Sequence, residues 1–330
     1  MTSLQSLLDE KRFLLADGAT GTNLFAAGLG PGDPPELWNV DRPETISALY
    51  RSFVEAGSDI ILTNTFGANS YRLKLHKAEG RVFELNKAAA ELARAVADAA
   101  GRPVVVAGSI GPTGELFEPL GELTEAGAIE AFTRQAEGLK AGGADVAWIE
   151  TMSAPEEIRA AARGAIAAGL PYTATASFDT AGRTMMGLQP DALGSVFADL
   201  PVPPVAFGAN CGVGASDLVM SVLDIVGGSG GVPVIAKANA GIPHFRGDAI
   251  HYSGTPELMA DYARLAADSG ARIIGGCCGS TAAHVRAMRA ALDGYSPGDR
   301  PDRAAVETAL GALVAPPSTA PARERQRRRG

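Results

Sequence analysis

Eight short apolar runs recur along the chain, and most are followed by a segment with helical spacing of its apolar residues. The runs occupy residues 13–18, 59–66, 104–110, 146–151, 172–178, 204–210, 233–241 and 271–278. Continuous rather than alternating apolarity is typical of strands buried on both faces, as in a parallel sheet covered by helices. The pattern therefore predicts an α/β protein built from eight β–α units.

The segments between the runs carry signals for helix ends. One begins with Pro43 and Glu44 and stops at Gly57, and another begins at Thr255 and stops at Gly270. An acidic first turn and a glycine after the last turn are typical of helix boundaries. Eight such units fit a (β/α)₈ TIM barrel better than an open doubly wound sheet, which usually has fewer strands. We predict a single barrel domain over residues 1–300.

Two stretches fall outside this repeat. The connection from Thr20 to Arg42 is long, and insertions of this kind usually lie over the mouth of a barrel. Residues 301–330 end in "APPSTAPARERQRRRG", which has no apolar periodicity and predicts a largely disordered C-terminal extension. A basic tail that touches RNA or a membrane surface is the alternative, but composition favours a solvated tail.

Composition and charge exclude several classes of protein. The formal net charge of −8 argues against a nucleic-acid surface, which needs clustered cations. The first 20 residues mix acids and bases into the apolar stretch, unlike a secretory signal, and no apolar run approaches a membrane span. Three cysteines do not suit a disulfide framework. We expect a cytoplasmic protein with reduced thiols, no membrane contact and no nucleic-acid partner.

The three cysteines all fall at predicted strand ends. Cys211 follows the sixth run, and Cys277 and Cys278 end the eighth. Carboxyl ends of barrel strands meet on one face, so the three sulfurs are expected to converge. Three thiolates with a free fourth position are typical of a catalytic zinc site. Glycines 275, 276 and 279 are expected to permit the turns that this needs. Small buried core residues are one alternative, and a redox pair is a weaker one.

Two acids also fall at strand ends, namely Asp17 and Glu150. They are either local caps and ion pairs or a pair of carboxylates that holds a substrate ammonium, and spacing alone does not decide. "DGATGT" around Asp17 lacks the glycine pattern of a nucleotide site. The four histidines form no ligand motif.

Seven motifs occur in a recognisable order: "DGATGTNL", "LTNTFGAN", "GSIGPTG", "WIETM", "GANCGVG", "NAG" and "GGCCGS". Over residues 10–293 the chain resembles the homocysteine S-methyltransferases. The resemblance implies a zinc ion held by Cys211, Cys277 and Cys278, which activates the substrate thiol. It also implies that Asp17 and Glu150 hold the homocysteine amino group and that amides near Gly18 and Ala19 receive its carboxylate. Asn64 and Asn239 complete the expected substrate-binding set, and Asn239 matches an asparagine that reaches the metal in some members.

The expected reaction transfers a methyl group from a small donor to homocysteine and yields methionine. Several stretches look like the stand-alone bacterial betaine-type enzymes, so glycine betaine is the favoured donor. The animal betaine enzymes have cage aromatics where this chain has Gly67 and Thr151, so Trp38, Phe66, Tyr71 and Tyr252 are alternative cage candidates. S-methylmethionine, S-adenosylmethionine, dimethylsulfoniopropionate and a methyl-corrinoid protein remain alternative donors. A non-catalytic zinc or thiol redox sensor is the competing class. Betaine-type relatives form oligomers, which makes a homo-oligomer an open expectation.

Overall fold

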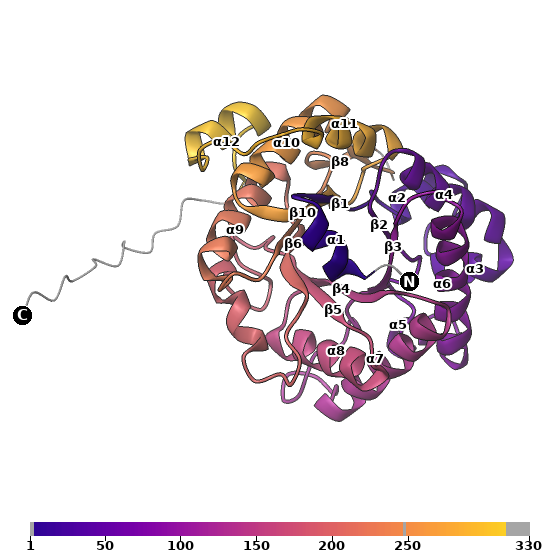
Figure 1. Ribbon diagram of the computed structural model, residues 1–330. Helices are drawn as coiled ribbons and strands as arrows, with labels where there is room; N and C mark the ends of the chain where they lie inside the picture. The colour runs from indigo at the N-terminus through magenta and orange to yellow at the C-terminus, as the bar shows by residue number, and fades with distance from the viewer. Residues whose placement is uncertain (1–2, 247–248, 315–330) are drawn as a thin grey trace, which may run out of the picture.

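The computed structural model describes residues 3–246 and 249–314, and its central feature is a closed ring of parallel strands surrounded by helices (Figure 1). The strands follow the order β1-β10-β7-β6-β5-β4-β3-β2, and a parallel bridge between Ala16 and Ile60 closes the ring. This confirms the predicted (β/α)₈ barrel. The ring consists of β1 Leu14–Leu15, β2 Ile60–Leu62, β3 Val105–Ile110, β4 Val146–Met152, β5 Tyr172–Ala176, β6 Ala206–Cys211, β7 Val234–Ala238 and β10 Ala271–Gly276.

Helices connect successive strands on the outside of the ring. After β5 this position is taken by the 3₁₀ segment η3 (Pro190–Phe197) rather than by an α-helix. The other outer helices are α4 Pro43–Glu55, α6 Val82–Asp98, α7 Glu125–Ala141, α8 Pro155–Ala168, α9 Ala215–Gly228, α10 Pro256–Asp268 and α11 Ala282–Leu292. The shorter elements in the connections are α2 Gly21–Ala26, η1 Pro35–Leu37, α3 Trp38–Asp41, α5 Ser70–Lys74 and η2 Glu79–Arg81.

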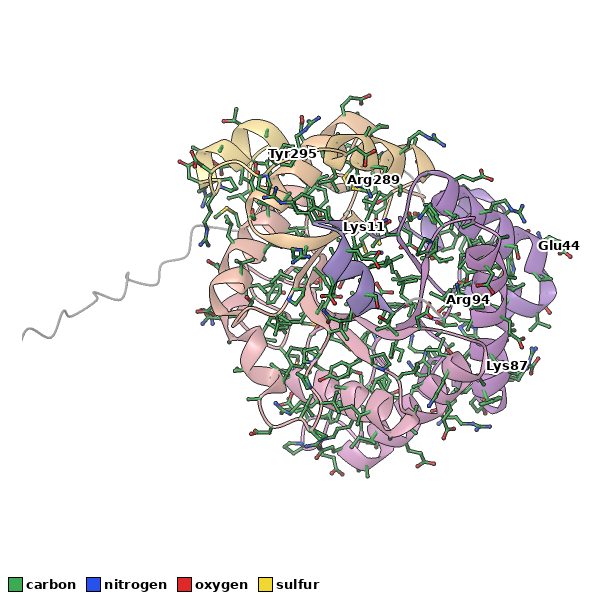
Figure 2. The ribbon with its side chains drawn as sticks, in the orientation of Figure 1. Lys11, Glu44, Lys87, Arg94, Arg289 and Tyr295 are labelled. Atoms are coloured by element: carbon green, nitrogen blue, oxygen red, sulfur yellow. The ribbon has the colours of Figure 1, made fainter. Side chains whose placement is uncertain are left out.

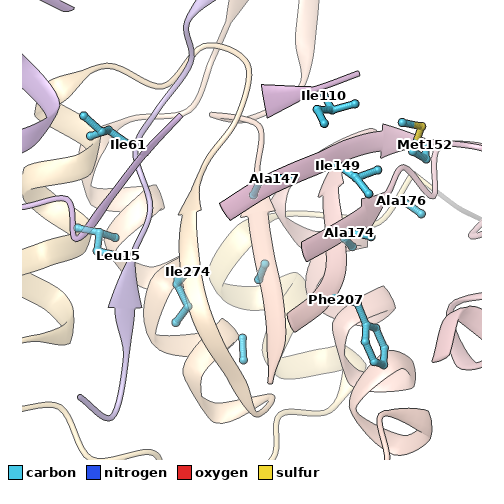
Figure 3. Close-up of a cluster of buried hydrophobic side chains, with 14 of the residues drawn as sticks. Leu15, Ile61, Ile110, Ala147, Ile149, Met152, Ala174, Ala176, Phe207 and Ile274 are labelled. Carbon is cyan, nitrogen blue, oxygen red and sulfur yellow. The ribbon is translucent and has the colours of Figure 1, made fainter. Parts of the chain in front are cut away.

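Successive residues of each strand belong to different layers of the core, which explains the continuous apolar runs. Leu15, Ile61 and Ile274 belong to the cluster shared with the outer helices, as do the labelled side chains of neighbouring strands (Figure 3). Leu14 and Ile60, one residue earlier, belong to a second cluster inside the ring. Since side chains alternate along a strand, both faces of every strand must be apolar.

Helix α1 (Leu4–Glu10) closes the amino-terminal end of the barrel and lies across its centre in Figure 1. Its residues Leu4, Leu7 and Leu8 are buried in the inner cluster together with Trp148. The other end of the barrel therefore provides the opening for ligands. Within the described ranges, no helix combines the length and apolarity needed to cross a bilayer.

Two elements depart from the sequence expectation. A two-stranded antiparallel hairpin, β8 (Pro243–Arg246) with β9 (Ala249–Tyr252), follows β7 and has no counterpart among the predicted strands. Helix α12 (Arg303–Leu310) forms within the extension that was expected to be disordered from residue 301. Its Val306 and Leu310 are buried, and the helix packs on α9 and α10. Residues 315–330, which include the arginine-rich ending, lie outside the described residues.

An ion-pair network around Asp59 joins distant parts of the amino-terminal face. Asp59 Oδ1 lies 2.6 Å from Lys11 Nζ, and Oδ2 lies 3.1 Å from Arg289 Nη1. The backbone amide of Leu15 also donates to Oδ2 over 2.9 Å. Lys11 and Arg289 lie near each other on the face that carries α1 (Figure 2). One buried carboxylate thus ties α1, β1 and α11 together.

Asp59→Ala is expected to lower the free energy of unfolding by about 2–3 kcal/mol, because a buried amide and two cations lose their acceptor. The two cations are partly exposed, which keeps the effect below that of a fully buried pair. Asp293→Ala is the matched control: its side chain is 66% exposed and pairs with the same Arg289. Urea denaturation of both variants measures the difference. Equal stabilities of the two variants would refute this role of Asp59.

Candidate metal and substrate site

A cavity of about 810 Å³ opens at the carboxyl-terminal end of the barrel. Its lining includes residues within the carboxyl-terminal halves of β3, β4 and β7, residues at the ends of β2, β6 and β10, and residues that follow β1, as expected for this fold. The long connection from Thr20 to Arg42 covers one side and contributes Phe25, Leu29 and Glu36 to the lining. The expectation that this insertion lies over the mouth is confirmed.

The three cysteines converge in this cavity. Their Sγ atoms all lie within 4.8 Å of one another. Cys211 is the last residue of β6, and Cys277 directly follows β10. The backbone amide of Cys277 donates to Ala238 O over 2.6 Å, so the pair is attached to the end of β7, which lies between β6 and β10.

Two buried asparagines hold the cysteine-bearing segments in place. Asn239 Nδ2 donates to Gly212 O, and Asn239 Oδ1 accepts from the amide of Cys278. Asn210 Oδ1 accepts from the amide of Thr151, and its Nδ2 donates to the Thr151 hydroxyl and lies 3.7 Å from Cys277 Sγ. Thr151 and Cys211 both have a φ of 61°, which is unusual for residues with a side chain. The asparagines therefore support a strained backbone where the sulfurs meet.

The glycines around the cysteine pair have different roles. Only Gly279 has a positive φ, of 78°, and a Cβ there would clash with the side chain of Tyr252. Gly275 and Gly276 do not supply the expected left-handed turns. They are small because Ala16 and Ser280 pack against them. The turn after Cys278 thus depends on Gly279.

Gly279→Ala is expected to weaken metal binding by about tenfold, because the turn and Tyr252 must both shift and supporting contacts of a metal site contribute on this scale. Gly182→Ala is the matched control, since Gly182 has a φ of 75° and open space around its Cβ position. Zinc affinity measured by competition with a chelator separates the two variants. The same affinity in both would mean that the close approach to Tyr252 does not position the cysteines.

The chemistry of the three sulfurs fits a thiophilic cation. Hydrogen bonds from Cys211 and Cys277 lower the pKa of Cys278 below its ordinary value, which favours one thiolate in the cluster. Zinc–sulfur bonds of about 2.3 Å in a tetrahedron place sulfurs about 3.8 Å apart, within the range that this cluster spans. Since zinc takes four ligands, three thiolates leave one position for a ligand from the cavity.

Asp17 forms a buried ion pair within the protein, which is one of the two alternatives that its place at a strand end leaves open. Its Oδ1 accepts from Lys237 Nζ over 2.7 Å, and its Oδ2 accepts from the amide of Leu62 over 2.7 Å. The side chains of Asp17 and Lys237 are only 1% and 2% exposed. Burial alone would lower the pKa of Lys237, but the carboxylates of Asp17 and Glu150 raise it above its ordinary value. Asp17 therefore has a resident cationic partner.

Glu150 reaches the cavity directly from β4. Its Oε1 accepts from Ser109 Oγ over 2.5 Å, and burial raises the pKa of its carboxyl to about 7. A bulge displaces the register of β4 between Ile149 and Met152, at the residues that place Glu150 and Thr151. Glu150 is the expected acid that remains available to a ligand.

Gly18, Ala19 and Asn64 line the cavity, and some of their polar groups already form hydrogen bonds within the protein. Gly18 and Ala19 line the cavity, but the amide of Ala19 already donates to Ser280 O over 3.1 Å. Asn64 also lines the cavity, and its Nδ2 donates to Pro35 O and Asn39 Oδ1. Asn64 thus supports the segment over the mouth.

Sequence reasoning missed Lys237, Asn210 and Ser109. Each is a polar residue within an apolar run. Ile235 and Ala107, two residues before Lys237 and Ser109, belong to the cluster inside the ring, and so does Ala206, four residues before Asn210. That periodicity of two was the available signal. Of the suggested aromatics, Phe66 and Tyr252 line the cavity together with Phe25, whereas Trp38 and Tyr71 are absent from its lining.

Comparison with known proteins decides the family. The family model described as homocysteine S-methyltransferase matches residues 14–292. The chain belongs to the homocysteine S-methyltransferase family. This agrees with the resemblance carried by the seven motifs.

Curated and solved relatives of this family extend the comparison. The chain is 32% identical over 318 residues to a methionine synthase of Mycobacterium tuberculosis, covering 92% of this chain and 26% of that protein. The chain thus spans about a quarter of this curated relative. The crystal structure of the homocysteine methyltransferase MmuM from Escherichia coli, oxidized form, has 26% identity and a TM-score of 0.73, covering 88% of this chain and 99% of that one. Its metallated form matches with a TM-score of 0.72, 26% identity, and coverage of 87% and 99%.

Proposed function

We propose that this protein is a zinc-dependent methyltransferase that converts homocysteine to methionine, with glycine betaine as the methyl donor. The observation that carries the proposal is the convergence of Cys211, Cys277 and Cys278 in a cavity that also contains the carboxyl of Glu150. Family membership supports homocysteine as the acceptor. The existence of a metallated form of MmuM supports a bound metal in this protein.

The three cysteines would hold the zinc ion. When bound, zinc supplies a Lewis acid that favours the thiolate form of the substrate sulfur, which is the nucleophilic form. The chain's own residues orient the substrate: Glu150 accepts the ammonium, and the cysteine loops, fixed by Asn210 and Asn239, determine where the substrate sulfur lies. The connection from Thr20 to Arg42 lies over the mouth and limits access of water to the cavity. Alignment of the substrate sulfur with the methyl carbon of the donor contributes to the rate.

Three aromatic side chains favour a cationic donor. Phe25, Phe66 and Tyr252 line the cavity. Aromatic faces attract quaternary ammonium groups by cation–π interaction, and glycine betaine carries such a group next to its transferable methyl. Phe25 and Phe66 are 53% and 37% exposed, which leaves their rings accessible from the mouth.

A donor panel tests this choice. Zinc-loaded protein is incubated with homocysteine and glycine betaine, S-methylmethionine, S-adenosylmethionine, dimethylsulfoniopropionate or a methyl-corrinoid protein, and methionine is quantified. Methionine together with dimethylglycine from glycine betaine is the expected result. Methionine formed only with another donor would show that glycine betaine is the wrong donor, and the proposed transfer to homocysteine would still stand. No methionine from any donor, with partner binding that changes on thiol oxidation, would favour the redox-sensor class.

Phe66→Ala is expected to raise the KM for glycine betaine about fivefold to tenfold, because a cation–π contact contributes about 1 kcal/mol or more. Steady-state kinetics at saturating homocysteine measure the change. Leu75→Ala, at a side chain that is 70% exposed, is the control for loss of exposed apolar area. A KM for betaine that is unchanged by Phe66→Ala would exclude this ring from the donor site.

A further inference from the structure

A second cavity lies on the amino-terminal face of the barrel, beside α1. It has a volume of about 470 Å³ and is formed by the segments that follow α1, α4 and α6 and by the end of α11. Small-molecule sites usually enclose about 300–1,000 Å³. Lys11, Arg289 and Tyr295, which line this cavity, lie on the same face in Figure 2. It shares no lining residue with the cysteine cavity, so a ligand in it would not touch the methyl-transfer site.

The lining of this second cavity has a surplus of positive charge. Four cationic and two acidic side chains contribute to it, which leaves two positive charges uncompensated. The six residues are Lys11, Arg12, Arg102, Arg289, Asp59 and Asp293. The whole chain, in contrast, has a net charge of −8. Cations held at one concave surface repel one another and attract counter-ions, so a bound anion would relieve this repulsion.

Asp59 holds three of the cations in place from the protein side. Its Oδ1 lies 2.6 Å from Lys11 Nζ and 3.9 Å from Arg102 Nη1, and its Oδ2 lies 3.1 Å from Arg289 Nη1. The Asp59 side chain is only 2% exposed, and one carboxylate carries one negative charge against these three. The cations are therefore ordered before a ligand arrives, which reduces the entropy cost of binding.

Several N–H donors of these cations remain available to a ligand. Arg102 Nη2 donates to Val54 O and Ser58 O, which fixes the guanidinium, while its Nε and Nη1 make no hydrogen bond within the described residues. Lys11 donates to Asp59, which uses one of its three N–H groups. Arg12 makes no hydrogen bond in the described part of the chain, and its guanidinium lies 5.8 Å from the centre of the Phe13 ring.

We propose that this cavity binds a phosphate dianion, either free or as the monoester of a small organic molecule, through Lys11, Arg12 and Arg102. A phosphomonoester carries a charge of about −1.5 to −2 at neutral pH, which matches the surplus of two positive charges. Its oxygens accept paired N–H groups from a guanidinium, which a single ammonium does not supply. In a monoester the organic part would lie against Leu292 and Tyr295, which continue the lining.

Binding of phosphate at this site is expected to stabilise the folded protein. The lining comes from four segments that are far apart in the sequence, so the unfolded chain does not present the site. A ligand that binds only the folded state raises the melting temperature as its concentration increases. The effect is expected to weaken as sodium chloride is added, because salt screens the partly exposed cations.

Isothermal titration calorimetry on the zinc-loaded full chain tests the proposal, with inorganic phosphate and adenosine 5′-monophosphate as anionic probes and adenosine as the neutral control. Both anions are expected to bind, and adenosine is not. Tighter binding of the monophosphate than of inorganic phosphate would show that the organic part contacts the cavity. Equal affinities would show that the phosphate group alone is recognised.

Three variants locate the binding. Arg12→Glu is expected to weaken both anions by about tenfold or more, the effect of a hydrogen bond to a charged group. Asp293→Asn removes one acid from the lining and is expected to tighten them by about twofold to fivefold. Arg286→Glu, at an exposed arginine of α11 that is outside the lining, makes the same change in net charge as Arg12→Glu and is expected to leave both affinities unchanged.

The melting temperature of Arg12→Glu without ligand shows whether the variant is folded, and no loss is expected because Arg12 has no hydrogen-bond partner among the described residues. If neither anion binds the wild type at concentrations up to about 10 mM, the proposal is wrong. It is also wrong if Arg12→Glu and Asp293→Asn bind both anions as the wild type does. The readout is independent of methionine formation, so the failure of this proposal and that of the proposed function are distinguishable.

Discussion

Cys277→Ala is expected to empty the thiol site of its metal and to stop methyl transfer. The structure places the three sulfurs within 4.8 Å of one another, so loss of one leaves two thiols and no compact ligand set. Structural zinc sites bind with about 10–16 kcal/mol over four ligands, which implies about 3 kcal/mol, or a hundredfold, for each ligand. Without the metal the substrate thiol stays protonated at neutral pH, and turnover falls at least as far.

Metal content after dialysis and the initial rate of methionine formation measure this prediction. Wild-type protein is expected to hold about one zinc ion per chain, and Cys277→Ala close to none. Ser195→Ala is a control of similar size, since its hydroxyl donates to Ala192 O on the surface. A metal-free variant with full activity would contradict zinc-dependent catalysis at these cysteines.

Asp17→Ala is expected to lower the free energy of unfolding by about 3–5 kcal/mol, the range seen when one partner of a buried ion pair is removed. The substitution leaves the Lys237 ammonium and the Leu62 amide without their acceptor inside the barrel. Removing the stranded charge as well, in Asp17→Ala/Lys237→Met, is expected to restore about 2 kcal/mol or more. Asp17→Asn keeps an oxygen acceptor at this position and is expected to be milder.

Denaturant unfolding followed by circular dichroism measures these variants against the wild type. The informative quantity is the coupling between the two positions. If Asp17→Ala and Lys237→Met destabilise the protein additively, the two side chains do not stabilise each other and Asp17 is not a holder of the lysine.

The sequence predicts the barrel well because its signals are local and repeated. Each of the eight apolar runs coincides with one ring strand, with β4 and β6 extending one residue beyond their runs, and the helices that start at Pro43 and Pro256 end just before the expected glycines. Convergence of the cysteines follows from topology alone, because parallel strands deliver their carboxyl ends to one face. The hairpin β8–β9 and helix α12 lack comparable signals. Helix α12 has two buried apolar residues, Val306 and Leu310, and their spacing of four is too little to establish a periodicity.

The partner of Asp17 was beyond sequence reasoning. Lys237 lies 220 positions away, and although its place in the strand indicates an inward side chain, nothing local shows which acid across the barrel it meets. The same limit applies to the Ala19 amide, whose acceptor Ser280 belongs to the turn after the last strand. Long-range hydrogen bonds between loops decide which polar groups remain available to a ligand, and spacing along the chain does not encode them.

The two asparagines that hold the cysteine loops have a consequence for the life of the protein in the cell. Asn210 and Asn239 bind backbone and side-chain groups on β4, β6 and the turn after β10, and the barrel strands anchor all of these. The folded barrel therefore positions the three cysteines without the metal, in contrast to small zinc domains that unfold without their ion. A chelator is expected to abolish methionine formation while the helical circular dichroism signal is retained. Adding zinc back is expected to restore activity without a refolding step. When zinc is scarce, such a chain would remain as a folded, inactive apoprotein that regains activity on binding zinc.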